Sequence, residues 1–156
     1  MNELFEYRGQ LLARLVAATE EFSKASISVR EPGTPLEADG WNVHQLAVHV
    51  RDVAAHVYGL RARRTVEEDN PVFQNFDGEA WMVEHYNPSE PIAQVLEGFT
   101  RSIMETTEWL ESSPQEAWSR LSRHAVYGGE FTMQTWIERS LAHIEEHLET
   151  AKKATT

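Results

Sequence analysis

Apolar residues recur with a helical period along most of this chain, and that pattern restricts the fold more than any other feature. The first stretch places these residues on one helical face: Leu4, Leu11, Leu15, Ala18 and Phe22. A repeat of 3.6 residues is typical of an amphipathic helix, whereas a half-buried strand alternates strictly. We find no convincing strand alternation. The pattern therefore predicts an all-α protein.

Four long helices are expected. They run from about Glu3 to Lys24, from Asn42 to near Arg64, through the stretch from Ile92 to Leu110, and from Thr132 to Lys152. The second helix has a defined start, because Asn42 followed by Gln45 matches a capping box. Its core-facing stripe is expected to be Leu46, Val50, Val53, Val57 and Leu60.

The connections between these helices differ in length. Residues 66–90 form a long crossover that holds a short helical piece from Asp77 to Tyr86, and the turn Tyr127-Gly128-Gly129 precedes the last helix. Long amphipathic helices joined in this way are typical of a four-helix bundle with a long crossover between helices two and three. We expect residues 1–156 to form this one domain.

Size and charge exclude several classes of function. No apolar run approaches the roughly 20 residues that a membrane span needs, and the acidic start Met1 to Glu6 lacks the basic region of a signal peptide. We therefore expect a cytoplasmic protein. The 14 basic and 25 acidic residues give a net charge of −11, which disfavours binding to a nucleic-acid backbone. Arg61, Arg63 and Arg64 are interpreted as a solvated helix end, because acids follow at once.

The chain contains no cysteine. Disulfides, zinc–thiolate sites and a protein thiol nucleophile are all excluded as a result. Any metal must be bound by His, Asp or Glu, and any sulfur chemistry must use a thiol from outside the protein.

Two histidines four residues apart lie in the last helix. His143 and His147 must project from one helical face, on the shoulder of the apolar stripe. His49 occupies the core edge of the second helix, and His56 shares that stripe about 10 Å further along the axis. Three imidazoles at one core edge would be left unsatisfied without partners, and a divalent ion would satisfy them together. Hydrogen-bonded core histidines remain the alternative.

The other histidines carry weaker indications. His44, in the first turn of the second helix, and His85, in the crossover, are expected to lie at the surface. His124 precedes the Tyr127-Gly128-Gly129 turn and could reach the mouth of the bundle, where it would contact substrate or support the metal ligands.

Several segments resemble the DinB/YfiT-like family. They are Gly40 to Asp52, Thr132 to Trp136 and Ala142 to Leu148, joined by shorter matches at 77–81, Tyr86, Arg101, Trp118, Arg120, His124 and Gly128. The matches keep their order over nearly the whole chain. The resemblance implies a four-helix bundle that binds a divalent metal, usually zinc or nickel, through three histidines.

Carried over by position, the resemblance assigns the metal ligands to His49, His143 and His147. Asp52 also matches the family pattern, whereas Ala54 stands where the family often has an acid. Characterised relatives include transferases and an isomerase that use low-molecular-weight thiols, so the resemblance implies such a thiol as a co-substrate.

Three functions remain open from the sequence. The first is a metal-dependent enzyme acting on a small molecule, by S-transfer or hydrolysis, with Asp52 or His124 assisting proton movement. The second is a non-catalytic bundle that binds a metal or a small ligand. The third is a helical interaction module whose histidines bind nothing. Exposed apolar residues on the helices are compatible with a homodimer.

Overall fold

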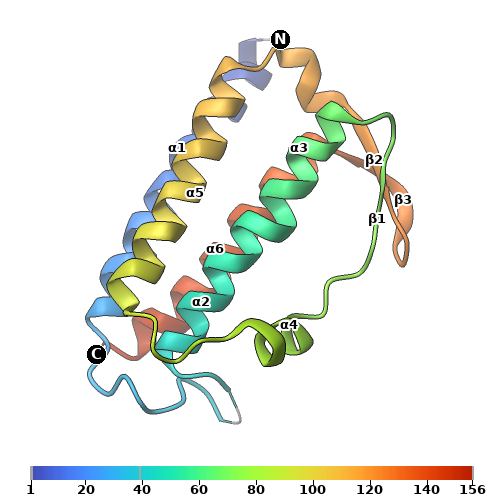
Figure 1. Cartoon of the computed structure of the whole chain (residues 1–156). Coiled ribbons are helices and arrows are strands. Elements are labelled where there is room, and N and C mark those ends of the chain that lie inside the picture. Colours follow the sequence, from blue (N-terminus) through green and yellow to red (C-terminus); the bar gives the residue numbers. More distant parts are fainter. Residues whose placement is uncertain (1, 39, 156) are drawn as a thin grey trace.

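The computed structural model describes residues 2–38 and 40–155, so residues 1, 39 and 156 of the predicted domain lie outside the described part. Its architecture is a bundle of four long helical rods (Figure 1). The rods are α1 (Asn2–Ile27), a second rod made of α2 (Val43–Val53), η1 (Ala54–Gly59) and α3 (Leu60–Glu67), then α5 (Ile92–Ser112) and α6 (Met133–Lys153). The predicted bundle and its long crossover are confirmed.

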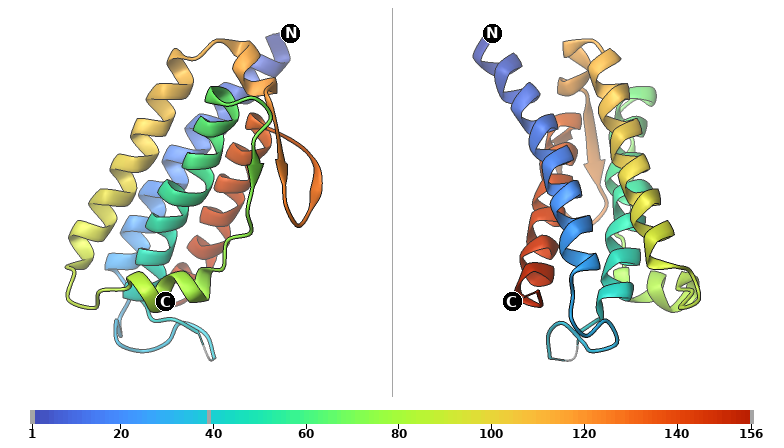
Figure 2. Two further views of the ribbon diagram at one scale, coloured as in Figure 1. Left: turned by 45° about the vertical axis from the view of Figure 1, so that its right-hand side comes forward. Right: turned by 90° about the vertical axis from the view of Figure 1, so that its left-hand side faces the viewer.

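The rods bury one continuous apolar core. α1 packs against α5 and α6, while the second rod contacts α5 through α2 and α6 through α3, as both views in Figure 2 show. The predicted stripe residues Leu15 and Phe22 of α1 lie in this core together with Phe99 of α5 and Ile144 of α6. Leu4 was predicted to face the core, but it lies near the N-terminus of α1 and is 37% exposed.

A capping box fixes the start of the second rod. The Asn42 side chain accepts a hydrogen bond from the Gln45 backbone N–H, and the Gln45 side chain accepts one from the Asn42 N–H. These bonds satisfy backbone donors that a helix start otherwise leaves without partners. His49 therefore lies at a defined angle, in the second turn of α2.

A π-helical segment, η1, interrupts the second rod. A π turn closes hydrogen bonds five residues apart and so contains one residue more than an α turn. Glycine at position 59 allows this segment to form, because the Cβ of any other residue would clash with the carbonyl oxygen of Ala54 at 2.6 Å. The extra residue rotates everything that follows by about 100° relative to a regular helix. Leu60, expected in the core, is therefore 46% exposed.

The expectation of no strands was wrong in one place. A small sheet of β1 (Val72–Phe73), β2 (Leu121–His124) and β3 (Gly128–Thr132) lies beside α3, in the order β1-β2-β3 (Figure 1). β1 pairs in parallel with β2, and β2 pairs antiparallel with β3. Strands this short offer too few residues for alternation to be visible in the sequence.

The rest of the crossover holds α4 (Gly78–His85), which crosses the end of the bundle near α2 (Figures 1 and 2). The Asp77 side chain caps it by accepting from the Ala80 N–H. A short 3-10 helix, η2 (Gln115–Ser119), links α5 to the sheet. Among the described residues, no helix is both long and apolar enough to cross a membrane.

Candidate metal centre

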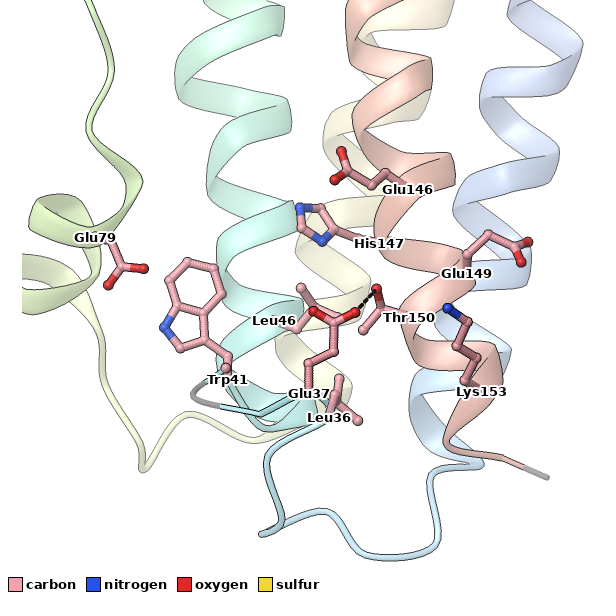
Figure 3. Close-up of a pocket in the computed structure, with 11 residues that line it drawn as sticks. Leu36, Glu37, Trp41, Leu46, Glu79, Glu146, His147, Glu149, Thr150 and Lys153 are labelled. Atoms are coloured by element: carbon pink, nitrogen blue, oxygen red, sulfur yellow. Dashed lines mark hydrogen bonds between the residues drawn. The ribbon is translucent and has the colours of Figure 1, made fainter.

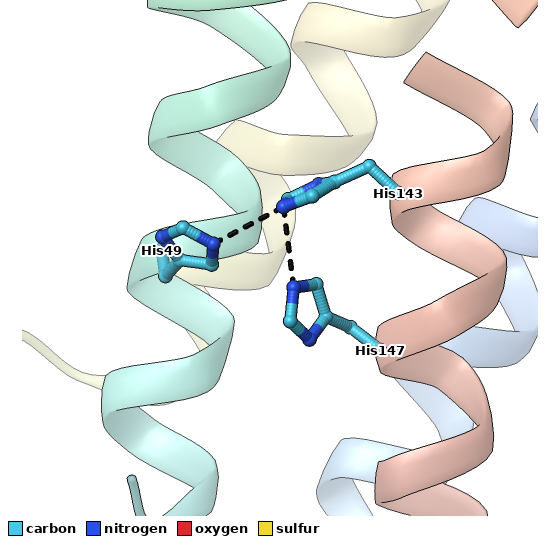
Figure 4. A group of neighbouring side chains, drawn as sticks. All are labelled: His49, His143 and His147. Carbon is cyan, nitrogen blue, oxygen red and sulfur yellow. Dashed lines mark hydrogen bonds between the residues drawn. The ribbon is translucent and has the colours of Figure 1, made fainter. Parts of the chain in front are cut away.

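Three histidines from two rods meet inside the bundle. His49 comes from α2, and His143 and His147 come from successive turns of α6 (Figure 4). Each offers one ring nitrogen, and these three atoms all lie within 4.8 Å of one another. The structure therefore brings together the three predicted metal ligands. We call these residues the histidine triad.

The Nε2 atom of His143 stands at the centre of the triad. It lies 3.1 Å from Nε2 of His49 and 3.2 Å from Nε2 of His147, the two contacts drawn in Figure 4. An imidazole nitrogen carries either one hydrogen or one lone pair, so it can form only one good in-plane hydrogen bond. Hydrogen bonds can thus satisfy one of these contacts but not both.

Burial keeps the triad uncharged. It lowers the pKa of His49 to about 4 and that of His143 to about 3, and the neighbouring His147 adds to both shifts. Burial also lowers the pKa of His147, although Glu146 and Glu37 act in the opposite direction. All three rings are therefore neutral at pH 7, which is the form that coordinates metals.

The ring of His49 is held from two sides. Trp41 packs against it with ring centroids 4.7 Å apart, and a Cβ on Gly78 would lie 3.3 Å from its Cε1 atom. Its Nδ1 atom is buried and has no hydrogen-bond partner among the described residues. Ala54, which stands where the family pattern often has an acid, carries no acceptor in its side chain.

Asp52 does not contact the triad through a hydrogen bond. Its carboxylate accepts from Arg51 Nε at 3.0 Å and from Trp81 Nε1 at 2.9 Å. It affects the triad through charge, since it acts to raise the pKa of His49. Because Trp81 belongs to α4, whose first residue Gly78 touches the His49 ring, Asp52 ties α4 against the site. This arrangement favours a positioning role over proton transfer.

His124 is 2% exposed and faces the same cavity as His49 and His143. Its Nδ1 faces the backbone N–H groups of Val126 and Tyr127, at 3.1 and 3.2 Å, and its one lone pair accepts a bifurcated hydrogen bond that the two donors share. The hydrogen of the neutral ring therefore sits on Nε2. Burial, Arg61 and Arg139 all lower the pKa of His124. These contacts leave the Nε2–H of a neutral His124 as the ring's hydrogen-bond donor.

The remaining histidines divide as follows. His85 is exposed, as expected, and stacks on Trp81. His56 is exposed as well, because it lies within the π segment and not on a regular continuation of the core stripe. His44 was expected at the surface but is half-buried, with ring nitrogens 2.6 Å from the Tyr86 hydroxyl and 2.6 Å from the Glu90 carbonyl oxygen.

Two cavities adjoin the triad from different sides. The first, here called the acidic cavity, has a volume of about 510 Å³ and is lined by His147, Trp41 and four glutamates: Glu37, Glu79, Glu146 and Glu149 (Figure 3). The second, here called the arginine cavity, has a volume of about 240 Å³. His49 and His143 line it together with Tyr58, Arg61, His124 and Arg139. Space for small molecules therefore exists on both sides of the histidines.

The sequence did not single out the arginine cavity. Arg61 was interpreted as part of a solvated helix end, which holds for Arg64, an exposed partner of Glu68. Arg61 instead faces inward, because the π segment gives it the angular position that a regular helix would give Leu60. Arg139 and Tyr58 carried no recognisable motif.

Comparison with known proteins identifies the fold family. The model of the DinB superfamily matches residues 8–151. Among solved structures, YfiT from Bacillus subtilis aligns with a TM-score of 0.86 over 96% of this chain and 86% of that chain, at 18% identity. That protein is described as a probable metal-dependent hydrolase with an unusual four-helix bundle topology. At this identity the likeness shows the fold alone, and no curated protein matches. The chain belongs to the DinB superfamily.

Proposed function

We propose that this member of the DinB superfamily is a metal-dependent enzyme whose divalent ion, zinc or nickel, is bound by His49, His143 and His147. The observation that supports this most is the meeting of three neutral Nε2 atoms, of which hydrogen bonding can pair only two. A divalent cation accepts all three lone pairs at once.

The spacing of the nitrogens fits such an ion. Zinc–nitrogen bonds of 2.0–2.1 Å in a tetrahedral arrangement place two ligand nitrogens roughly 3.3 Å apart. Nε2 of His143 lies 3.1 and 3.2 Å from the other two nitrogens, and all three atoms lie within 4.8 Å of one another. Three protein ligands with cavities beside them are typical of a catalytic site and not of a closed structural one. Nickel suits the same imidazole donors.

A bound divalent ion supplies Lewis acidity, which lowers the pKa of water or of a thiol beside it and polarises a carbonyl group. The chain's own residues then orient the reactants. His124 donates a hydrogen bond from Nε2, and Tyr58, whose pKa is raised by burial, offers a phenol donor in the same cavity. Trp41 and Gly78 hold the His49 ring, and Asp52 keeps α4 in place.

Hydrolysis of a small molecule is the first reaction to test, because YfiT is described as a probable metal-dependent hydrolase. Transfer of a low-molecular-weight thiol is the second, since a chain without cysteine must take sulfur from a co-substrate. Both reactions use the same metal ligands and differ in the nucleophile.

The test has two stages. Elemental analysis of protein purified without chelator or metal-affinity resin should find close to one zinc or nickel ion per chain. The same analysis of the His143→Ala variant should find no metal. A turnover screen with small esters, amides and thiol–electrophile pairs should then show activity that His49→Ala lacks. If metal is present but no such turnover is found, the protein is a non-catalytic metal-binding bundle. Absence of metal would contradict the proposal.

Two expectations about partners stay predictions. We expect a homodimer, which light scattering coupled to size-exclusion chromatography would check. We also expect no binding to DNA or RNA, because the net charge of −11 repels a phosphate backbone. A titration with labelled DNA at low salt would check this.

A further inference from the structure

The arginine cavity concentrates positive charge in an acidic protein. The chain has 25 acidic and 14 basic residues, yet no carboxylate lines this cavity among the described residues. Arg61 reaches it from α3 and Arg139 from α6, and the His49 and His143 rings form its wall toward the triad. Charge of one sign has been gathered beside the proposed metal.

Arg61 is held in place without an ionic partner. Its Nη2 donates to the Gln74 carbonyl oxygen at 3.0 Å, and its guanidinium lies 4.8 Å from the centroid of the Trp136 ring. Within the described part of the chain it forms no ion pair. Burial and the nearby charge of Arg139 lower its pKa. Burial and Arg139 both disfavour the charged form of Arg61, and an anion between the two guanidiniums would stabilise that form.

Arg139 is positioned in a similar way from α6. Its guanidinium lies 5.0 Å from the centroid of the Phe131 ring and 5.9 Å from that of Tyr127. No ion pair involves it in the residues that the structure describes. Aromatic rings thus support both guanidiniums, and their N–H donors are not taken by carboxylates of the protein.

Other donors face the same space. His124 and Tyr58 also line the cavity, and Arg61 and Arg139 both act electrostatically on each of these residues. Two guanidiniums, a neutral imidazole N–H and a phenol form a set of donors suited to an oxyanion. The volume of about 240 Å³ is enough for a small anion.

We propose that the arginine cavity binds the carboxylate or phosphate group of a small substrate through Arg61 and Arg139, and so holds the rest of that substrate beside the histidine triad. This deepens the proposed function, on which its catalytic meaning rests. The two arginines proposed to bind the anion lie outside the triad, so anion binding can be tested on protein from which the metal has been removed.

The test is a binding titration with propionate and with inorganic phosphate, followed by isothermal calorimetry or NMR chemical shifts at low ionic strength and without chloride. Chelator-treated protein is used, so that no metal can bind the anions. At least one anion should bind, and propionamide, the neutral isostere of propionate, should bind at least tenfold more weakly. Which anion binds more tightly identifies the group that the site prefers.

Variants assign the binding to the cavity. Arg139→Gln, at an exposed position that should fold normally, and Arg61→Gln should each weaken anion binding about tenfold or more, as expected for a lost hydrogen bond to a charged group. Arg63→Gln is the matched control, because it removes the same charge from α3 but faces Trp109. His147→Ala should keep anion binding while losing metal, because His147 lines the acidic cavity and not the arginine cavity, and this variant separates failure of this proposal from failure of the proposed function.

Three results would overturn the proposed anion site. The first is that neither anion binds detectably, and the second is that propionate and propionamide bind equally well. The third is that Arg139→Gln and Arg63→Gln weaken anion binding equally. Retained metal binding in Arg61→Gln and Arg139→Gln, measured by elemental analysis, would show that their effect does not come from disruption of the triad.

Discussion

The two cavities adjoin the triad through different histidines, His147 in the acidic cavity and His49 with His143 in the arginine cavity, and they have opposite charge. Glutamates dominate the lining of the acidic cavity, whereas Arg61 and Arg139 provide all the charged groups of the arginine cavity. The acidic cavity follows the overall composition of the chain, and the arginine cavity runs against it. The difference shows that the net charge of a protein predicts its long-range field, but not the sign of charge in a particular cavity.

The origin of the difference lies in the second rod. In a regular helix the angular position now occupied by Arg61 would belong to Leu60, an apolar residue. The π segment Ala54–Gly59 moves Leu60 outward and Arg61 inward. π segments of this kind are often found at functional sites. A single extra residue in one turn therefore changes the chemistry of one cavity and leaves His49, which precedes it, in place.

Loss of a triad histidine should have the largest effect. In His143→Ala the central nitrogen of the triad is lost, and we expect metal affinity to fall by more than about 100-fold, beyond the effect of losing an outer partner. His85→Ala, which removes an exposed imidazole from α4, should bind metal like the unchanged protein. Equal metal content in the two variants, measured by elemental analysis, would contradict the triad as the site.

Acid should destabilise the metal-free protein through the buried rings of His49 and His143. The pKa values of His49 and His143 are about 4 and about 3 in the folded state, against about 6.5 in an unfolded chain. Between these values the unfolded chain binds more protons, so stability rises with pH across this window. The melting temperature of chelator-treated protein should therefore fall as the pH drops from 6.5 toward 4. A weaker dependence is expected in His143→Ala, and an identical one would count against the buried neutral rings.

A change at Gly59 should affect the arginine cavity alone. In Gly59→Ala the new Cβ would meet the Ala54 carbonyl oxygen at 2.6 Å, which disfavours the π segment and should lower the free energy of unfolding by about 1–3 kcal/mol. If the helix becomes regular, Arg61 turns away and anion binding weakens, whereas metal binding at His49 persists. Urea denaturation and the propionate titration measure the two effects. Unchanged stability together with unchanged anion binding would show that the π segment does not control this cavity.

Neutralising the acidic cavity should have the smallest effect. Glu146 contributes only charge to the triad, by acting to raise the pKa of His147. In Glu146→Gln we expect metal affinity to fall less than about threefold, as is usual for a partly screened surface charge. Anion binding in the arginine cavity should not change. A loss of anion binding in Glu146→Gln comparable to that in Arg139→Gln would remove the distinction between the two cavities.

Much of the fold and the metal centre could be predicted from the sequence because the relevant signals are local and periodic. The capping box of Asn42 and Gln45 sets the start of α2, and the i,i+4 spacing of His143 and His147 sets a shared face on α6. Together these place imidazoles at comparable depth on two packed rods. Once α2 and α6 pack in a bundle, His49 lies beside that pair, so this contact could be predicted from the fold class.

The rest depended on features without a local signature. No residue pattern predicts a π turn, so the exposure of Leu60 and the inward position of Arg61 could not be predicted. β1 contains two residues and pairs with β2 about 50 positions later, a contact that periodicity cannot reveal. The backbone bonds to Nδ1 of His124 depend on the turn that follows β2. His44 is half-buried only because the end of the crossover folds back over it.

X-ray absorption spectroscopy on the zinc- or nickel-loaded protein tests the central claim most directly. We predict a first shell with three imidazole nitrogens, at about 2.0–2.1 Å for zinc, plus at least one further light ligand, and a clear loss of imidazole scattering in His49→Ala. A shell made only of oxygen ligands, or a spectrum that His49→Ala leaves unchanged, would contradict a shared ion between α2 and α6.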